Sequence, residues 1–245
     1  MISVGWLADK HNPPGGAEFT QQEFRDAAPS DISVRDVETR GPLPADIDKF
    51  VVHNCLTYER IPDWAPVIRY VHDLTGIHCK PDKVIFCSPQ QRDKYEMDGE
   101  LIPPPIDLAK FRPPRQVKRN GKRNGICCVG AFMNPGKGGH LVEDWATTND
   151  KIVDFYGWGP FSPQGPHIQD RGPIDKHLVP QLLWQYETFI FLPTCLEPFG
   201  RCVAEAWAAG CQVITNDLVG AKWWIENEPD ALETAAGDFW KSVLA

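Results

Sequence analysis

The chain has 245 residues, of which 42% are hydrophobic and 24% charged, and its formal net charge at pH 7 is −8. These values are typical of a globular protein with one large domain or two small ones, and no apolar run approaches the ~18 residues of a membrane span. The acidic balance argues against a protein that binds nucleic acid over its whole surface.

Short runs rich in β-branched residues recur along the first part of the chain, at 2–8, 32–37, 50–54, 66–72 and 83–88. A second series follows at 125–132, 151–157, 187–193 and 211–216. Runs this apolar suit strands that are covered on both faces, and their alternation with helix-like segments predicts parallel sheets. The expected fold class is therefore α/β, with two Rossmann-like doubly wound parallel sheets facing each other across a cleft.

A proline-rich segment, ELIPPPIDLAKFRPPR, separates the two series of strands. Clustered prolines mark rigid connections. We therefore expect an N-terminal domain at 1–108, a linker at 109–124 and a C-terminal domain at 125–245. The final helix-like stretch, 231–245, could pack on either half.

The basic stretch 112–125, RPPRQVKRNGKRNG, contains no acidic residue. Our main interpretation is a solvated hinge. The alternative is a docking strip for a polyanionic acceptor, either lipid headgroups or nucleic acid.

The eight cysteines form no CxxC pair, and most lie in apolar, strand-like contexts. They are interpreted as buried free thiols in a reducing compartment, with no metal site. The start of the chain lacks a basic segment followed by an apolar one, so we expect no signal peptide and a cytoplasmic location.

Three junctions between a strand and a helix carry candidate binding residues. Gly15-Gly16 follows the first strand, and a glycine pair there lets backbone amides approach an anion. His72 ends a strand, where its ring can face a ligand or serve as a structural hydrogen-bonding group. In GAFMNPGKGG a strand ends near Gly130, and Lys137 stands just before a helix, where it can meet a phosphate or simply lie exposed.

The segment LEPFGRCVAEAWAAG places two glutamates around a turn and a short helix. Gly200 permits the turn, and the free amides near Phe199–Arg201 at the helix entrance suit a phosphate. Glu197 lies outside the helix, and Glu205 lies about 6 Å along its axis. A ligand with hydroxyl groups on both sides of a diphosphate fits this spacing, because carboxylates accept hydrogen bonds from vicinal hydroxyls.

With these motifs in order, the chain resembles retaining glycosyltransferases of the GT-B fold, most like family 4, in a short version. The E-x7-E pattern of Glu197 and Glu205 resembles the C-terminal signature of that family. Further similarities cover most of the chain and lie in PGGAE, VHD, IPPPIDLAKFRP, VGAFMNPGKG and YGWGP.

The resemblance implies a donor that is a nucleoside-diphosphate sugar, no cofactor and no metal. It implies that Glu205 holds the ribose and that Glu197 contacts the donor sugar. Other roles that it implies are neutralisation of the diphosphate by Lys137 and the amides near Phe199–Gly200, a place near the transferred sugar for His72, and donor contacts for Gly15, Gly16, Gly130 and Arg201. The implied catalytic residues are His72, Lys137 and Glu197, and the implied reaction retains the anomeric configuration by front-face attack.

The sequence departs from the family pattern at several positions. Ala131 stands where the family has a phosphate-binding arginine, and Arg201 is the candidate replacement. Thr194 replaces the usual serine, and Ala221 replaces a glycine. The implied acceptor is a glycan, a lipid-linked sugar, a small molecule or a modified nucleic acid. The alternatives are a nucleotide-sugar-binding protein of the same fold without transfer activity, and a sugar epimerase or phosphorylase on that fold.

Overall fold

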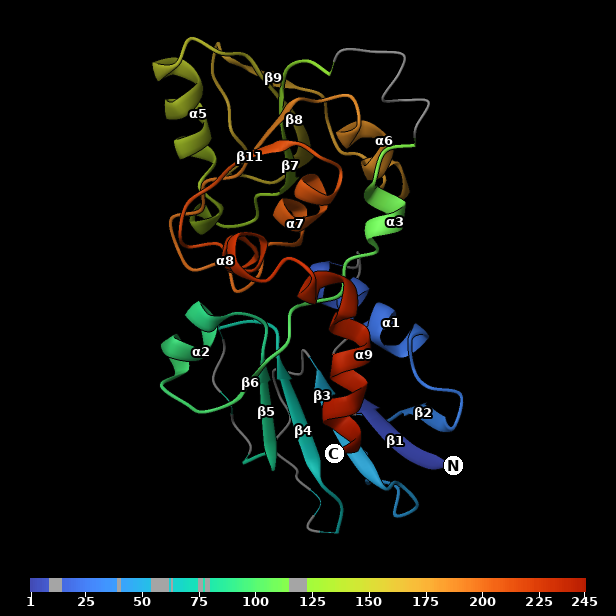
Figure 1. The fold of residues 1–245 in the computed structure, drawn as a ribbon. Helices are drawn as coiled ribbons and strands as arrows, with labels where there is room; N and C mark the ends of the chain where they lie inside the picture. The colour runs from blue at the N-terminus through green and yellow to red at the C-terminus, as the bar shows by residue number, and fades with distance from the viewer. Residues whose placement is uncertain are drawn as a thin grey trace. The chain divides into compact units, whose positions relative to one another are not determined.

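A computed structural model describes residues 1–8, 15–38, 41–53, 62, 64–74, 77, 80–114 and 123–245. The chain forms two compact units. Unit 1 comprises Met1–Pro105 together with Glu228–Ala245, and unit 2 comprises Ile106–Asn227. The helices and strands of both units are labelled in Figure 1.

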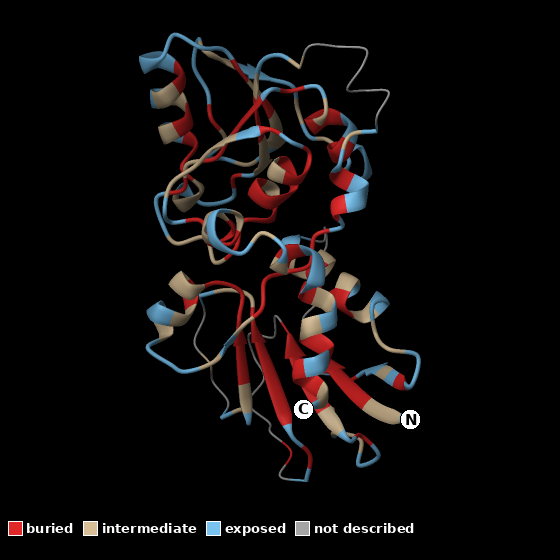
Figure 2. Ribbon diagram, in the orientation of Figure 1, coloured by how far each residue is buried: buried red, intermediate tan, exposed pale blue. Residues whose placement is uncertain are grey.

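Unit 1 contains a six-stranded sheet in the order β2-β1-β3-β4-β5-β6, and all neighbouring strands are parallel. Its strands are β1 (Ile2–Leu7), β2 (Ile32–Asp36), β3 (Lys49–His53), β4 (Val67–Val71), β5 (Lys83–Phe86) and β6 (Glu100–Leu101). Its helices are α1 (Gly16–Asp26), α2 (Pro89–Tyr95) and α9 (Ala231–Leu244). The central strands are buried along most of their length, as Figure 2 shows.

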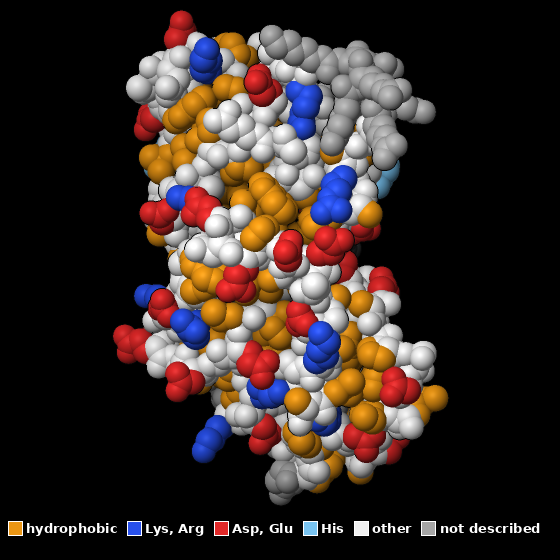
Figure 3. Space-filling view, in the orientation of Figure 1, with side chains coloured by type: hydrophobic (Ala, Val, Ile, Leu, Met, Phe, Trp, Pro, Cys, Tyr) orange, Lys and Arg blue, Asp and Glu red, His pale blue; other side chains and the backbone are white. Residues whose placement is uncertain are grey.

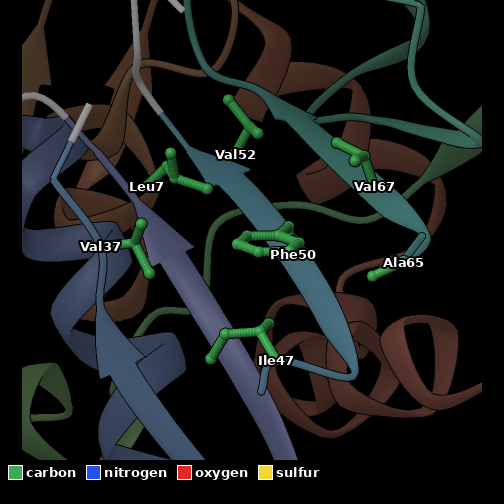
Figure 4. Close-up of a cluster of buried hydrophobic side chains, with 7 residues drawn as sticks. All are labelled: Leu7, Val37, Ile47, Phe50, Val52, Ala65 and Val67. Carbon is green, nitrogen blue, oxygen red and sulfur yellow. The ribbon is translucent and has the colours of Figure 1, made fainter. Parts of the chain in front are cut away.

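Side chains of unit 1 alternate between the two faces of its sheet. One face carries the buried cluster of Figure 4, formed by Leu7, Val37, Ile47, Phe50, Val52, Ala65 and Val67. Gly5 lies under this cluster, and a Cβ atom there would be 2.8 Å from the Phe50 ring. The neighbouring side chain of Trp6 turns to the opposite face, where its ring lies 5.9 Å from that of Phe239 and 6.4 Å from that of Trp240.

Helix α9 belongs to the core of unit 1 although it comes last in the sequence. The Phe239 ring stacks on Phe24 of α1 at 4.1 Å, and Trp240 Nε1 donates to the Phe24 carbonyl oxygen at 2.7 Å. The carbonyl oxygens at the end of α9 accept hydrogen bonds from two strand lysines, Lys49 and Lys83. Cations at this position complement the negative end of a helix.

Unit 2 contains a five-stranded parallel sheet in the order β11-β10-β7-β8-β9. Its strands are β7 (Ile126–Ala131), β8 (Val153–Trp158), β9 (Ile168–Asp170), β10 (Thr188–Ile190) and β11 (Gln212–Ile214). Its helices are α3 (Leu108–Phe111), η1 (Pro135–Lys137), α5 (Gly139–Thr148), η2 (Lys176–Leu178), α6 (Val179–Leu183), α7 (Arg201–Ala208) and α8 (Gly220–Asn227).

The α/β fold class and each predicted strand are confirmed. The structure adds the short edge strands β6 and β9, which are too brief to give a recognisable apolar run. Unit 2 runs over Ile106–Asn227, and α9 joins unit 1, which is one of the two placements that the sequence leaves open. No helix in the described part of the chain is long and apolar enough to cross a membrane.

The basic stretch 112–125 is described only at its two ends, and residues 115–122 lie outside the described chain. Arg123 is not part of a solvated strip. Its guanidinium donates to the carbonyl oxygens of Leu183 and Tyr186, both at 2.6 Å, and of Ala209 at 2.8 Å. This side chain therefore connects the segment just before β7 to the ends of α6 and α7.

The cysteines that the structure describes are free thiols, while Cys55 and Cys79 lie outside the described residues. Burial confirms the interpretation for Cys87, Cys127, Cys128 and Cys211. Cys195 is a correction, because its side chain is exposed in the loop after β10.

We predict that Trp240→Ala lowers the free energy of unfolding of unit 1 by about 3–5 kcal/mol, because it empties a buried aromatic site and removes a hydrogen bond. Urea unfolding followed by circular dichroism measures this. The matched control is Lys241→Ala, since the Lys241 side chain is 80% exposed and its removal should leave stability nearly unchanged. Equal stabilities of the two variants would contradict the placement of α9 in the core.

Candidate functional site

The carboxyl ends of the parallel strands in unit 2 lie at one edge of its sheet, where loops of α/β folds bind ligands. The loop after β7 and the loop after β10 both leave this edge. The sequence-predicted residues Lys137, Glu197, Phe199, Gly200 and Arg201 all lie in these loops or at the helix entrance that follows. Gly130 lies instead within β7, opposite Gly157 of β8.

Glycines allow the two loops to approach each other closely. Gly138 has a φ of +73°, and a Cβ atom there would lie only 1.8 Å from the Leu192 carbonyl oxygen. A Cβ atom on Gly136 would lie 2.4 Å from Cys195 Sγ, and the Gly136 carbonyl accepts a hydrogen bond from the Thr194 amide at 2.9 Å. No other residue type fits this contact without moving the backbone.

The close approach brings Lys137 and Glu197 into an ion pair. Lys137 Nζ donates to Glu197 Oε2 at 2.5 Å, and both side chains are partly exposed, at 31% and 22%. Burial lowers the pKa of Lys137, but the charge of Glu197 and its hydrogen bond outweigh this effect, so the pKa lies above its ordinary value. Lys137 therefore stays cationic at neutral pH, beside a carboxylate that solvent can reach.

A second loop fixes the backbone of Glu197. The Glu197 amide donates to the Leu218 carbonyl at 2.7 Å, and its carbonyl accepts from the Gly220 amide at 3.0 Å. The Phe199 carbonyl accepts from the Ala221 amide at 2.7 Å, and the Phe199 side chain is buried. The methyl group that distinguishes Ala221 from the family's glycine is thus accommodated without loss of this contact.

Gly200 is the last residue of the loop after β10 and immediately precedes α7. Its φ of +80° is left-handed, and a Cβ atom would lie 2.8 Å from Val219 Cγ1. Gly200 has no side chain to accept a hydrogen bond from the first amides of α7, and its carbonyl oxygen accepts one from the Val203 amide at 2.9 Å. These amides and the positive end of the helix dipole suit an anion at the position that the sequence predicts.

Glu205 lies one turn into α7 and is almost fully enclosed, with 2% of its surface exposed. Lys176 Nζ donates to Glu205 Oε1 at 2.5 Å, and Arg201 Nε lies 3.4 Å from the same oxygen. Arg201 is itself buried, so its guanidinium lies against Glu205 instead of extending into solvent at the helix entrance. A buried carboxylate between two cations is a stable arrangement, whereas an unpaired one is costly.

The Cys202 thiol lies within electrostatic reach of both ion pairs. Burial, with a smaller contribution from the carboxylates of Glu197 and Glu205, raises the pKa of Cys202 to about 12 against the opposing charges of Lys137 and Lys176. The thiol therefore stays protonated and is a poor nucleophile.

The predicted residues of unit 1 lie at the carboxyl edge of its own sheet. Gly15 precedes α1, and its amide donates to Glu18 Oε2 at 2.7 Å, so this amide already has a hydrogen-bond partner within the protein. Gly16 opens the helix and is exposed. His72 follows β4 and its ring lies 5.4 Å from that of His53.

His53 was not among the sequence-predicted residues. Its ring is fully buried and stacks on Tyr70 at 5.1 Å. Burial holds the pKa of His53 well below its ordinary value, and the nearby charges of His72 and Arg69 act in the same direction. His53 is therefore neutral at physiological pH, and its ring packs against those of Tyr70 and His72.

Lys176 is the residue of this site that sequence analysis missed. It opens a single 3-10 turn in the segment RGPIDKHLVP, where an isolated lysine carries no pattern. Among the described residues no group of three or more His, Cys, Asp or Glu side chains is arranged to hold a metal ion.

No protein-family model and no curated protein matches this sequence. Solved structures do match. AviGT4, a glycosyltransferase involved in avilamycin A biosynthesis, superposes with a TM-score of 0.68 at 16% identity, over 97% of this chain and 88% of that chain. HepE from Anabaena, in complex with UDP and glucose, gives a TM-score of 0.67 at 14% identity, over 99% of this chain and 95% of that chain.

A third match is an alpha-glucosyltransferase in complex with UDP-glucose and DNA containing an abasic site, with a TM-score of 0.59 at 10% identity, over 98% of this chain and 94% of that chain. Identities this low show the fold alone. The fold is that of the GT-B glycosyltransferases, which confirms the expected fold class.

We predict that Gly138→Ala destabilises unit 2 more than Gly165→Ala. Both positions have a positive φ, at +73° and +100°, so both substitutions carry backbone strain of about 1 kcal/mol or more. Only the first adds a collision with the Leu192 carbonyl, because nothing lies within 4 Å of a Cβ atom on Gly165. Thermal unfolding of both variants compares them, and equal losses would contradict the close contact of the two loops.

Proposed function

We propose that this chain is a retaining, metal-independent glycosyltransferase. It transfers a sugar from a nucleoside-diphosphate sugar to a hydroxyl group of an acceptor. The observation that carries this proposal is the pair of cation–carboxylate contacts at the entrance of α7, Lys137 with Glu197 and Lys176 with Glu205, on a GT-B fold. The similar HepE and alpha-glucosyltransferase structures hold UDP with glucose, or UDP-glucose, which supports this class of donor.

In this proposal the donor diphosphate binds at the first amides of α7. Their positive dipole favours the anion, and Lys137 adds a full positive charge beside it. Lys137 then shares its ammonium group between Glu197 and a phosphate oxygen. Glu205, deeper along the helix, accepts hydrogen bonds from the ribose, and Glu197 accepts them from the hydroxyls of the donor sugar.

The reaction forms a bond from the acceptor oxygen to the anomeric carbon, on the face that the diphosphate leaves. The bond between that carbon and the phosphate oxygen breaks, and its electron pair departs on the diphosphate. The acceptor proton passes to the departing phosphate oxygen. Lys137 and the helix amides stabilise the negative charge that develops there, which is the part a metal ion plays in other transferases.

Three residues of unit 1 complete the proposal. We propose that His72 lies near the transferred sugar and that Gly15-Gly16 borders the donor phosphate and the acceptor. The acceptor is a glycan, a lipid-linked sugar, a small molecule or a modified nucleic acid. The alpha-glucosyltransferase complex with DNA supports keeping nucleic acid among these classes. On the face drawn in Figure 3, acidic and basic side chains are interspersed instead of forming one broad basic surface.

One observation favours a second function, a nucleotide-sugar-binding protein without transfer activity. Ala131 replaces the family's arginine, and the proposed substitute Arg201 is buried against Glu205. Lys137 is then the main side-chain cation for the diphosphate. Incubation of the purified protein with UDP-glucose, GDP-mannose and other donors decides between the two, because release of nucleoside diphosphate requires catalysis.

We predict that Glu205→Gln mainly raises the donor KM, by about tenfold to a hundredfold. It removes a charged acceptor of ribose hydrogen bonds that acts equally in the ground and transition states. Glu197→Gln and Lys137→Met should instead lower kcat, because they face groups whose charge changes as the glycosidic bond breaks. Steady-state kinetics separates these effects. A normal kcat for Glu197→Gln, or unchanged donor binding by Glu205→Gln, would contradict these roles.

We also predict that EDTA leaves the transfer rate unchanged, since Lys137 and the α7 amides supply the positive charge. The initial rate is compared in EDTA and in added magnesium or manganese. A rate that disappears in EDTA and returns with either metal would contradict the metal-independent mechanism.

A further inference from the structure

We infer that Lys176 is a donor-binding residue of this site, which both contacts the ribose and positions Glu205. This inference rests on the proposed function and identifies a residue that the motifs of the sequence do not indicate. Lys176 opens η2, 29 residues before Glu205, and reaches α7 from the segment that follows β9.

The first support is the difference in exposure between the two partners. Glu205 has 2% of its side chain exposed, whereas Lys176 has 34% exposed. Because the ammonium nitrogen lies 2.5 Å from Oε1, Lys176 forms part of the surface around an otherwise enclosed carboxylate. A ribose that approaches Glu205 therefore meets Lys176 as well.

The second support is the oxygen that the cations use. Lys176 and Arg201 both contact Oε1 of Glu205. The Lys176 side chain is 34% exposed, whereas the Arg201 side chain is only 7% exposed. Two cations at one oxygen restrict the orientation of the carboxylate, and in the proposed function Oε2 is the oxygen that accepts from a ligand hydroxyl.

The third support is the charge of the group. The Glu205 carboxylate lies beside two cations, Lys176 and Arg201. Together with Lys137 and the α7 dipole this favours a ligand that is anionic close to its ribose, as a nucleoside diphosphate is. Lys176 therefore contributes to affinity through its charge and to ribose selectivity through Glu205.

The test measures calorimetric binding of UDP and of 2′-deoxy-UDP to the full chain. We expect the wild-type protein to prefer UDP. Lys176→Met should weaken UDP binding about tenfold or more and reduce this preference, and Lys176→Arg should restore part of both. Lys151→Met is the matched control, because Lys151 is exposed at the amino end of β8 and should change neither.

A double-mutant comparison separates positioning from general loosening of the fold. In a Glu205→Gln background, Lys176→Met should have little further effect on the ratio of the two affinities. A merely structural role would weaken UDP and 2′-deoxy-UDP equally. If thermal unfolding shows that Lys176→Met does not fold, Lys176→Gln takes its place in each comparison.

The outcomes distinguish this inference from the proposed function. A wild-type protein that binds no nucleoside diphosphate overturns the proposed function, and this inference with it. Wild-type binding that prefers UDP, with the same affinity and preference in Lys176→Met, overturns the inference alone. Tighter UDP binding by Lys176→Met also overturns it, since Lys176 would then be a cover that the ribose has to displace.

Discussion

The candidate site depends on one close contact between two backbone segments. The loop after β7 lies directly against the carbonyl of Leu192 at the end of β10, at a distance that only glycine at 138 allows. Lys137 precedes this contact by one residue, and Glu197 follows Leu192 by five. The contact therefore determines that a lysine and a glutamate from distant parts of the chain meet at 2.5 Å. In this unit the packing of two backbone segments determines which charged side chains meet.

The charged side chains that the backbone brings together form ion pairs. Two cation–carboxylate pairs lie around the first turns of α7, and each charge has a partner of opposite sign. Such pairs can be partly buried without a large loss of stability, because neither charge is left alone in a medium of low polarity. In the proposed function, an incoming phosphate or sugar hydroxyl replaces one hydrogen bond of these pairs with another, so that little reorganisation of the site is needed.

Much of the fold could be predicted from the sequence, because apolar runs bounded by glycine and proline report buried strands directly. The helix of LEPFGRCVAEAWAAG and its turn at Gly200 were predictable for the same local reasons. Partners far apart in the sequence were not. Lys176 carries no local pattern, and the placement of α9 depends on Phe24 and Trp6 at the other end of the chain.

The position of α9 also has a consequence for the order in which the chain can fold. Unit 1 is discontinuous, since residues 106–227 of unit 2 are inserted between its sheet and its last helix. During synthesis on the ribosome, all of unit 2 emerges before the aromatic side chains of α9 are available. The rings of Trp6 and Phe24 therefore lack their contacts with Phe239 of α9 while the second unit is being synthesised. A nascent chain of this kind exposes an apolar surface on its first unit until α9 has been synthesised, and it is during this interval that a chaperone would be needed.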